Sequence, residues 1–161
     1  MNKDVLVHVL SKVEFHSLLE GNKVDDENVD EFISHAFISI NDSSGEYYNK
    51  AIFHRNHHNV LTLWFDDVIV DNEPSPTNQA PDTKAFSKEQ AKQIIEFVNE
   101  NQNAKGFIIH CAAGISRSGA VGQWIIDLFE GDQGKFERTN PHIFPNGYII
   151  RTLNETYKNS K

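Results

Sequence analysis

The segment between residues 105 and 129 constrains the fold of this chain more than any other. It opens on a short apolar run within Lys105–His110, of the kind found in buried strands. It closes with Ser118–Phe129, which is long enough and suitably mixed in composition for a buried helix. Between these runs lie Cys111, the one cysteine of the chain, and Arg117, six positions further on. The segment therefore predicts a strand, a tight loop and a helix N-terminus in direct succession.

The spacing of Cys111 and Arg117 suits the binding of a phosphate dianion over a thiolate. Five intervening residues are enough for the backbone to curl into a bowl whose amide hydrogens point inwards and which the guanidinium closes. Gly114 can adopt the backbone angles that such a bowl needs. The positive end of the following helix stabilises a thiolate and a phosphate alike, and Ser118 is placed to donate its hydroxyl to the sulfur.

Residues 110–118, His-Cys-Ala-Ala-Gly-Ile-Ser-Arg-Ser, resemble the active-site signature of the cysteine-dependent protein tyrosine phosphatase superfamily, and in particular its dual-specificity branch. The resemblance implies that Cys111 is the nucleophile and that Arg117 holds the phosphate. It implies supporting roles for Ser118, beside the sulfur, and for His110, which orients the loop and favours the thiolate. The implied phosphate-binding residues are Cys111, Ala112, Ala113, Gly114, Ile115, Ser116 and Arg117.

Hydrolysis of a phosphate ester also needs a group that protonates the leaving oxygen. Asp66 and Asp67 are the candidates, because they follow the strand-like run Asn59–Phe65 upstream of the cysteine. The resemblance places the general acid in such a strand-end loop and favours Asp67 over Asp66, as the second aspartate of the pair. The alternative is that both aspartates are solvated residues of a turn.

The activity that the resemblance implies is hydrolysis of phosphate monoesters through a phosphocysteine intermediate. No metal or other cofactor is needed, because arginine and amide dipoles supply the charge stabilisation. The implied substrates are phosphotyrosine in proteins, with phosphoserine and phosphothreonine as further candidates. The uncharged loop positions favour a phosphorylated protein or a small phosphate ester over a highly anionic lipid. Two alternatives stay open: a catalytically silent phosphate-binding module, and a phosphatase of a small-molecule phosphate.

The remaining pattern predicts an α/β fold with a central mixed or mostly parallel sheet flanked by helices. The expected elements upstream of the loop are strands at Val5–Leu10, Ala36–Ile40 and Asn59–Phe65, and a helix at Ser11–Glu20. A further helix begins after Ser87, which forms a capping-box pattern with Gln90. At 161 residues the chain is long enough for one domain with a core, so residues 1–161 are expected to form a single catalytic domain.

Four smaller features complete the interpretation. Residues 71–81 contain three prolines among polar residues and predict an irregular surface loop. The histidines within residues 54–58 predict an exposed polar turn rather than a metal site. Pro145 suits the first turn of a final helix, and Trp64 lies in an apolar run and is expected in the core.

The composition excludes several classes of function. The formal charge of -8, from 23 acidic and 15 basic residues, argues against nucleic acid as a partner, because binding a polyanion needs clustered lysine and arginine. A single cysteine excludes an internal disulfide framework and fits a reducing compartment. The N-terminal apolar run is too short for a signal peptide or a membrane span, so we expect a cytoplasmic protein without a membrane partner. The oligomeric state stays open.

Overall fold

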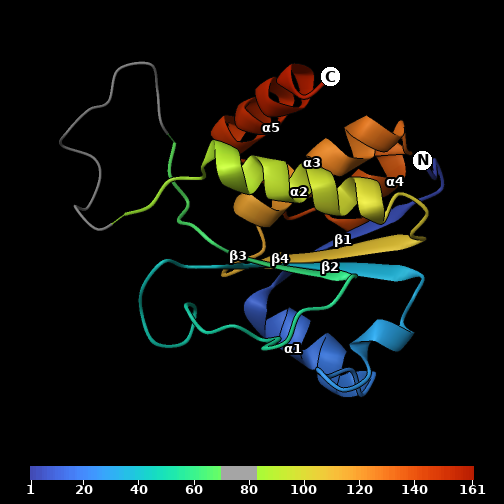
Figure 1. Ribbon diagram of the computed structural model, residues 1–161, viewed down its shortest axis with the longest axis vertical. Coiled ribbons are helices and arrows are strands. Elements are labelled where there is room, and N and C mark those ends of the chain that lie inside the picture. Colours follow the sequence, from blue (N-terminus) through green and yellow to red (C-terminus); the bar gives the residue numbers. More distant parts are fainter. Residues whose placement is uncertain (70–82) are drawn as a thin grey trace.

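A computed structural model describes residues 1–69 and 83–161 of the chain (Figure 1). Its elements, in chain order, are β1 (Leu6–Ser11), α1 (Lys12–Gly21), the 3-10 helix η1 (Val29–Glu31), β2 (His35–Asn41), β3 (Val60–Trp64), α2 (Lys88–Glu100), β4 (Gly106–Cys111), α3 (Arg117–Phe129), α4 (Gln133–Thr139) and α5 (Gly147–Asn159). The loop expected at residues 71–81 lies outside the described residues.

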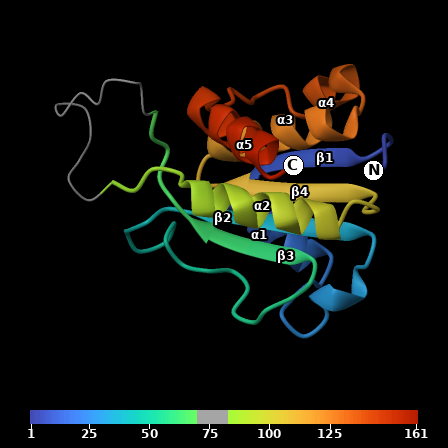
Figure 2. The same cartoon turned by 45° about the horizontal axis from the view of Figure 1, so that its top comes forward.

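The strands form one parallel sheet in the order β1-β4-β2-β3, which can be followed in Figure 2, where the top of the molecule is turned forward. β4 is central, and Gly106 is in register with both Leu6 of β1 and His35 of β2. Every residue of β4 is buried, as its apolar sequence requires in a parallel sheet that is covered on both faces. Because the strands run the same way, their carboxyl ends meet at one edge. The expected α/β fold with a mostly parallel sheet is confirmed.

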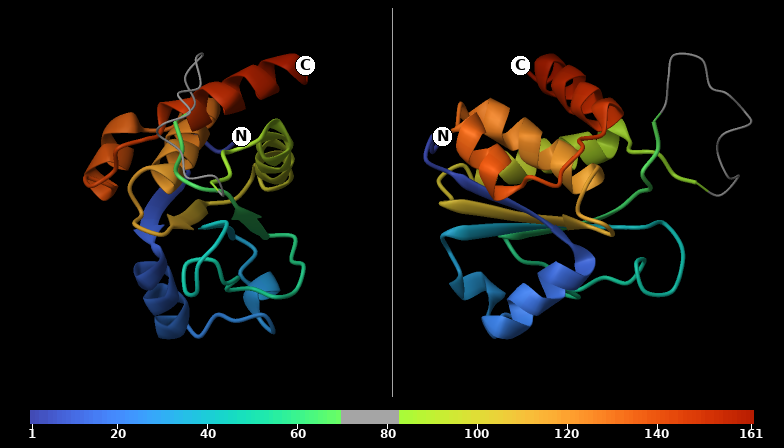
Figure 3. Two further views of the ribbon diagram at one scale, coloured as in Figure 1. Left: turned by 90° about the vertical axis from the view of Figure 1, so that its left-hand side faces the viewer. Right: turned by 180° about the vertical axis from the view of Figure 1, so that it is seen from behind.

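Helices cover both faces of the sheet. α2, α3, α4 and α5 lie on one face, whereas α1 and η1 lie on the other, as the views from the side and from behind also show (Figures 1 and 3). Side chains of β4 alternate between the two layers: Phe107 and Ile109 enter the larger core, and Ile108 packs with Phe15 and Phe37 in the smaller one. This double covering fixes β4, and with it the start of the loop that follows Cys111.

Two capping boxes fix the starts of α1 and α2. The Ser11 hydroxyl accepts a hydrogen bond from the Glu14 amide at 3.1 Å, and the Glu14 carboxylate accepts the Ser11 amide at 2.9 Å. Ser87 and Gln90 make the same reciprocal pair, with both bonds 3.1 Å long. The apolar face of α2, formed by Ala91, Ile94, Ile95 and Val98, is buried. The predicted capping box and helix are thus confirmed.

Two expectations about single residues are wrong. α5 begins at Gly147 with Asn146 as its N-cap, so Pro145 precedes the helix instead of lying in its first turn. The Asn146 side chain accepts the first free amides of the helix, which a proline ring cannot do. Trp64 is 42% exposed, because β3 is an edge strand, and its indole nitrogen donates to the Asn49 carbonyl at 2.7 Å. An apolar run alone does not distinguish an edge strand from a central one.

The histidine cluster at residues 54–58 also differs from expectation. His54 and His58 are exposed, but the side chain of His57 keeps only 2% of its accessible surface. Its Nε2 lies 2.8 Å from an Asp26 oxygen and its Nδ1 lies 2.7 Å from an Asp30 oxygen. Burial lowers the pKa of His57, but the hydrogen bonds and charges of the two carboxylates outweigh burial and raise that pKa above its ordinary value. His57 therefore joins two loops that are distant in sequence.

Replacement of His57 by alanine is expected to lower the free energy of unfolding by ~1–3 kcal/mol near pH 5.5, and by much less near pH 9. Because the pKa of His57 is raised on folding, its stabilising contribution is fully present at pH values below the ordinary histidine pKa of about 6.5. This contribution is lost as the pH rises through the raised pKa. The pKa values of Asp26 and Asp30 are lowered, so their contribution is lost only as the pH falls through those lowered values.

Urea unfolding at a series of pH values measures this effect. His54→Ala serves as the control, because the His54 side chain is exposed in the same loop. An equal loss of stability for His57→Ala at both ends of the pH range would contradict the charged pairing.

Among the helices of the described residues, none combines the length and the apolar composition needed to cross a membrane. Within the same residues, no group of three or more histidine, cysteine, aspartate or glutamate side chains is arranged to hold a metal ion.

Candidate active site

The loop of residues 112–116 joins the end of β4 to the start of α3, at the carboxyl edge of the sheet. Gly114 makes its closure possible, because its φ is +71° and a Cβ at this position would lie 2.4 Å from backbone atoms of Leu10 and Ser11. Any side chain at this position would force the loop away from β1. The predicted succession of strand, tight loop and helix N-terminus is therefore present.

The carbonyl groups of the loop are fixed on its outer side. Those of Ala112, Ile115 and Ser116 each accept a hydrogen bond from a backbone amide outside the loop, at 3.2, 3.0 and 3.1 Å respectively. The donors are the amides of Lys12, Phe144 and Asn146. In a trans peptide the N–H points away from the carbonyl of the same unit, so the amides of residues 113, 116 and 117 face the opposite, inner side. Inward-facing amides of this kind have the form of a nest, the backbone arrangement that binds anions in proteins.

The sulfur of Cys111 lies at the base of this nest. The whole Cys111 residue is only 2% exposed. The Ser118 hydroxyl is 3.0 Å from Sγ, and the Gly114 amide donates to Sγ at 3.3 Å. Both groups can donate to a thiolate, and hydrogen bonds to an ionised acceptor are stronger than those to a neutral one. Ser118, which is fully buried in α3, therefore contacts the sulfur.

The N-terminus of α3 lacks a side-chain cap. Ser116 occupies the N-cap position, but its hydroxyl donates to Asp67 at 2.8 Å instead of accepting from the first turn of the helix. The first amides of a helix have no partner within the helix, and they carry the positive end of its dipole. The start of α3 therefore adds to the attraction of the nest for an anion.

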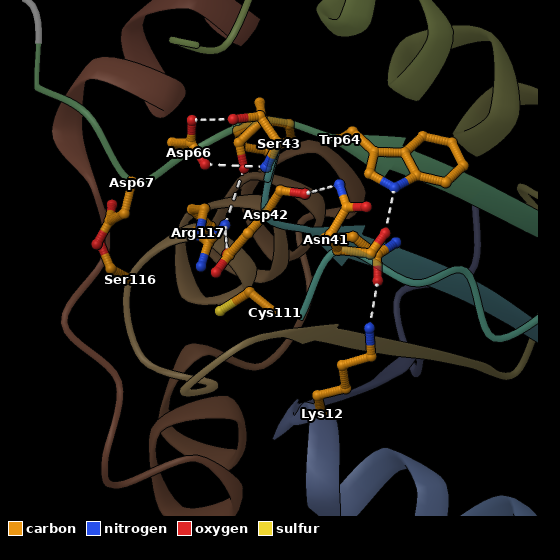
Figure 4. Close-up of polar contacts among 12 residues, drawn as sticks. Lys12, Asn41, Asp42, Ser43, Trp64, Asp66, Asp67, Cys111, Ser116 and Arg117 are labelled. Atoms are coloured by element: carbon orange, nitrogen blue, oxygen red, sulfur yellow. Dashed lines mark hydrogen bonds and ion pairs between the residues drawn. The ribbon is translucent and has the colours of Figure 1, made fainter. Parts of the chain in front are cut away.

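Arg117 is the first residue of α3, and its guanidinium is held through a single nitrogen atom, Nη1 (Figure 4). Its Nη1 donates to the Phe65 carbonyl at 2.8 Å and lies 2.7 Å from an Asp42 carboxylate oxygen. The side chain is 8% exposed. Among the described residues, no partner contacts its Nε or Nη2. The guanidinium is thus anchored through one nitrogen, and its other donors are available to a bound anion.

His110 is a neutral residue beneath the loop. Its Nε2 is 2.6 Å from the Ser39 hydroxyl, and its Nδ1 is 3.2 Å from the Cys111 carbonyl. A carbonyl can only accept, so Nδ1 carries the proton and Nε2 accepts from Ser39. Burial, with smaller contributions from nearby cations, lowers the pKa of His110 to about 3. His110 therefore acts on the loop by orienting the Cys111 peptide and contributes no positive charge to it at neutral pH.

The two candidate acids lie in different surroundings. Asp66 accepts hydrogen bonds from the Ser43 amide at 3.0 Å, the Ser43 hydroxyl and the Lys84 amide at 2.8 Å. Partial burial raises the pKa of Asp66, but these donors and the charge of Arg117 outweigh it, so the pKa is lowered overall. Both oxygens of Asp66 are thus engaged in holding the β2–β3 loop against the segment before α2.

Asp67, in contrast, is exposed and contacts the loop of residues 112–116 directly. Its Oδ1 accepts from the Ser116 hydroxyl and from the Asn146 side-chain amide, both at 2.8 Å. Asn146 uses its own carbonyl oxygen to cap α5 through the amides of Tyr148 and Ile149. One asparagine therefore connects Asp67 to the start of the last helix.

Three of these partners were not among the residues selected from the sequence: Ser39, Asp42 and Asn146. Ser39 and Asp42 lie in or directly after the run predicted as a strand at residues 36–40, and the carboxyl ends of parallel strands meet at the edge where such sites form. That rule could have selected them. Asn146 follows Pro145, the residue that was expected to start the final helix, although asparagine is itself one of the favoured N-cap residues.

The crystal structure of human tyrosine phosphatase-like serine/threonine/tyrosine-interacting protein aligns with 93% of this chain and 86% of its own, at 18% sequence identity and a TM-score of 0.50. The chain has a dual-specificity-phosphatase-like fold. The crystal structure of Tk-PTP in the active form aligns with 83% of this chain and 86% of its own, at 20% sequence identity and a TM-score of 0.38. No family model matches the sequence, and no curated protein matches it. The likeness to the first of these structures establishes the fold.

Proposed function

We propose that this protein is a cysteine-dependent phosphatase that hydrolyses phosphate monoesters through a phosphocysteine intermediate. The observation that carries this proposal is the Cys111 sulfur within a closed loop, 3.0 Å from the Ser118 hydroxyl and 3.3 Å from the Gly114 amide, with Arg117 at the end of that loop. These groups are the nucleophile, its stabilising donors and the phosphate cradle that the chemistry requires. Arg117 and the loop backbone at residues 112–116 would hold the phosphate.

In the first step the Cys111 thiolate attacks phosphorus in line with the leaving oxygen. A sulfur–phosphorus bond forms and the phosphorus–oxygen ester bond breaks, while Arg117 and the loop amides hold the three other oxygens. Asp67 donates its proton to the leaving oxygen. In the second step the Asp67 carboxylate takes a proton from water, whose oxygen attacks phosphorus, and the sulfur leaves as a thiolate beside Ser118. The products are an alcohol or phenol and inorganic phosphate.

We assign the general acid to Asp67 instead of Asp66. Asp67 touches the phosphate loop through Ser116, and its Oδ2 has no partner among the described residues, so that oxygen is free to carry the proton. Asp66 has donors on both oxygens and a lowered pKa, which favours a permanently ionised carboxylate. A group that must be protonated when the ester binds is poorly served by such surroundings.

Asp67→Asn is expected to lower kcat by about a hundredfold or more with phenyl phosphate, because a positioned general acid contributes roughly 10²–10⁴-fold. The loss should be smaller with p-nitrophenyl phosphate, whose leaving group needs less protonation. The high-pH fall of the kcat profile, which reports loss of the acid's proton, should disappear in this variant. Asp66→Asn is the matched comparison and should retain that fall in activity. Small, equal effects of both substitutions would place the proton donor elsewhere.

The surroundings of the loop bear on the substrate. Its variable side chains are uncharged, and Ala113 and Ile115 are exposed at its outer surface. The carboxylates of Asp42 and Asp67 lie beside Arg117 and Ser116, and the chain carries a formal charge of -8. These charges disfavour substrates with several phosphates. We therefore propose phosphotyrosine in proteins as the substrate, with phosphoserine, phosphothreonine or a small phosphate ester as further candidates. We also propose that the protein acts in the cytoplasm, because its single cysteine fits a reducing compartment.

Turnover of p-nitrophenyl phosphate in the presence of EDTA tests the proposal. We expect steady turnover that added magnesium does not increase, because no step needs a metal. Absence of turnover by protein that still binds tungstate would favour a catalytically silent phosphate-binding module. That module is the weaker candidate, since Cys111, Arg117 and Asp67 all have the side chains that catalysis requires.

A further inference from the structure

Asp42 follows β2 directly and contacts Arg117 from the side of Nη1. We propose that Asp42 is a positioning residue, which fixes the Arg117 guanidinium so that its Nε and Nη2 groups face the bound phosphate. This inference rests on the proposed function, because it concerns how the cradle of that site is built. Asp42 itself would not touch the substrate.

Two acceptors on one nitrogen define the orientation of the Arg117 side chain. The Phe65 carbonyl lies 2.8 Å from Nη1, and the Asp42 oxygen lies 2.7 Å from the same atom. The guanidinium is planar, so fixing Nη1 against two groups also fixes the direction in which the other donors point. A long side chain that is already ordered loses less rotamer entropy when it binds the transition state.

Asp42 is in turn held by its own loop (Figure 4). Its amide donates to the Tyr48 carbonyl at 2.8 Å, and its carbonyl accepts from the Asn49 side-chain amide at 2.9 Å. The Asn49 carbonyl accepts the indole N–H of Trp64 at 2.7 Å. The loop of residues 42–50 is therefore closed on itself and attached to the end of β3.

A buried lysine ties the two ends of this loop together. Lys12 is 1% exposed, and its ammonium donates to the Asn41 side chain at 3.0 Å, the Tyr47 carbonyl at 2.9 Å and the Lys50 carbonyl at 2.6 Å. All three protons of the ammonium are thus used by Asn41, the last residue of β2, and by two carbonyls of the loop that follows it. Lys12 lies in the first turn of α1, next to the phosphate loop, since its backbone amide donates to the Ala112 carbonyl. One residue therefore connects the loop that carries Asp42 with the loop that carries the nucleophile.

Asp42→Ala is the central test, with Glu46→Ala as the matched control, because Glu46 is exposed in the same loop. We expect Asp42→Ala to lower kcat for p-nitrophenyl phosphate about tenfold or more and to change KM less than threefold. Orthovanadate, which mimics the transition state, should inhibit the variant less strongly by the same factor as kcat/KM falls. Asp42→Asn should retain more activity than Asp42→Ala, because its amide oxygen can still accept from Nη1.

The outcomes separate this inference from the proposed function. A kcat for Asp42→Ala within twofold of Glu46→Ala, a gain in activity, or a loss that matches the fraction of unfolded protein would overturn the positioning role. If the wild-type protein shows no turnover, the proposed function fails, and the affinity for orthovanadate, measured by calorimetry, decides about Asp42 instead. In that case about tenfold weaker binding by Asp42→Ala supports the positioning role, and equal binding overturns it.

Discussion

Replacement of Cys111 by serine is expected to lower turnover of phosphate esters more than about a thousandfold while leaving tungstate binding within a fewfold of wild type. The serine hydroxyl is not ionised near neutral pH, so it cannot act as the thiolate does. The loop amides and Arg117 remain in place, because the substituted atom is similar in size and Gly114 and Ser118 can still donate to it. The loss corresponds to about 4 kcal/mol or more of transition-state stabilisation.

The measurement is single-turnover and steady-state hydrolysis of p-nitrophenyl phosphate, with tungstate titration by calorimetry on the same preparations. The thermal midpoint of the variant should lie within a few degrees of wild type, which excludes unfolding as the cause. Residual activity above about a thousandth of wild type would show that Cys111 is not the nucleophile.

Replacement of Arg117 by lysine is expected to lower kcat/KM by about a hundredfold or more, which is about 2.7 kcal/mol or more. A lysine ammonium is a single point of charge and cannot contact the Phe65 carbonyl, Asp42 and two phosphate oxygens in one plane. The positive charge is retained, so this substitution separates the geometry of the fork from its charge.

Arg151→Lys is the matched control, because Arg151 is an exposed arginine of α5. Its kcat/KM should stay within twofold of wild type. If Arg117→Lys retained more than about a tenth of wild-type activity, charge alone would be enough and the bidentate cradle would be wrong.

Much of the local structure around the site could be predicted from the sequence. The strand, loop and helix around Cys111 follow from an apolar run, a glycine and a second mixed run, all within one contiguous segment. α2 follows from the Ser87 and Gln90 capping box and its apolar face. These features depend on residues close together in the sequence, and the period of the apolar residues and the capping pattern are set by the local backbone geometry.

Contacts between segments distant in sequence could not be predicted in the same way. Asp66 and Asp67 are adjacent and chemically identical, yet one is held by Ser43 and the other contacts Ser116. The sequence predicts that His57 is exposed, and only the folded chain brings Asp26 beside it. The sequence predicts that Trp64 lies in the core, but the strand order places β3 at the edge of the sheet.

The sequence by itself determined the succession of strand, loop and helix around Cys111, because Cys111, Gly114 and Arg117 lie in one contiguous segment between two apolar runs. The tertiary structure decided what surrounds that loop: which aspartate faces it, and that Asp42 holds the arginine. The physical reason is that parallel strands bring their carboxyl ends to one edge, so the order of strands in the sheet sets which loops become neighbours. That order depends on the burial of both faces of the sheet by helices, a property of the whole chain.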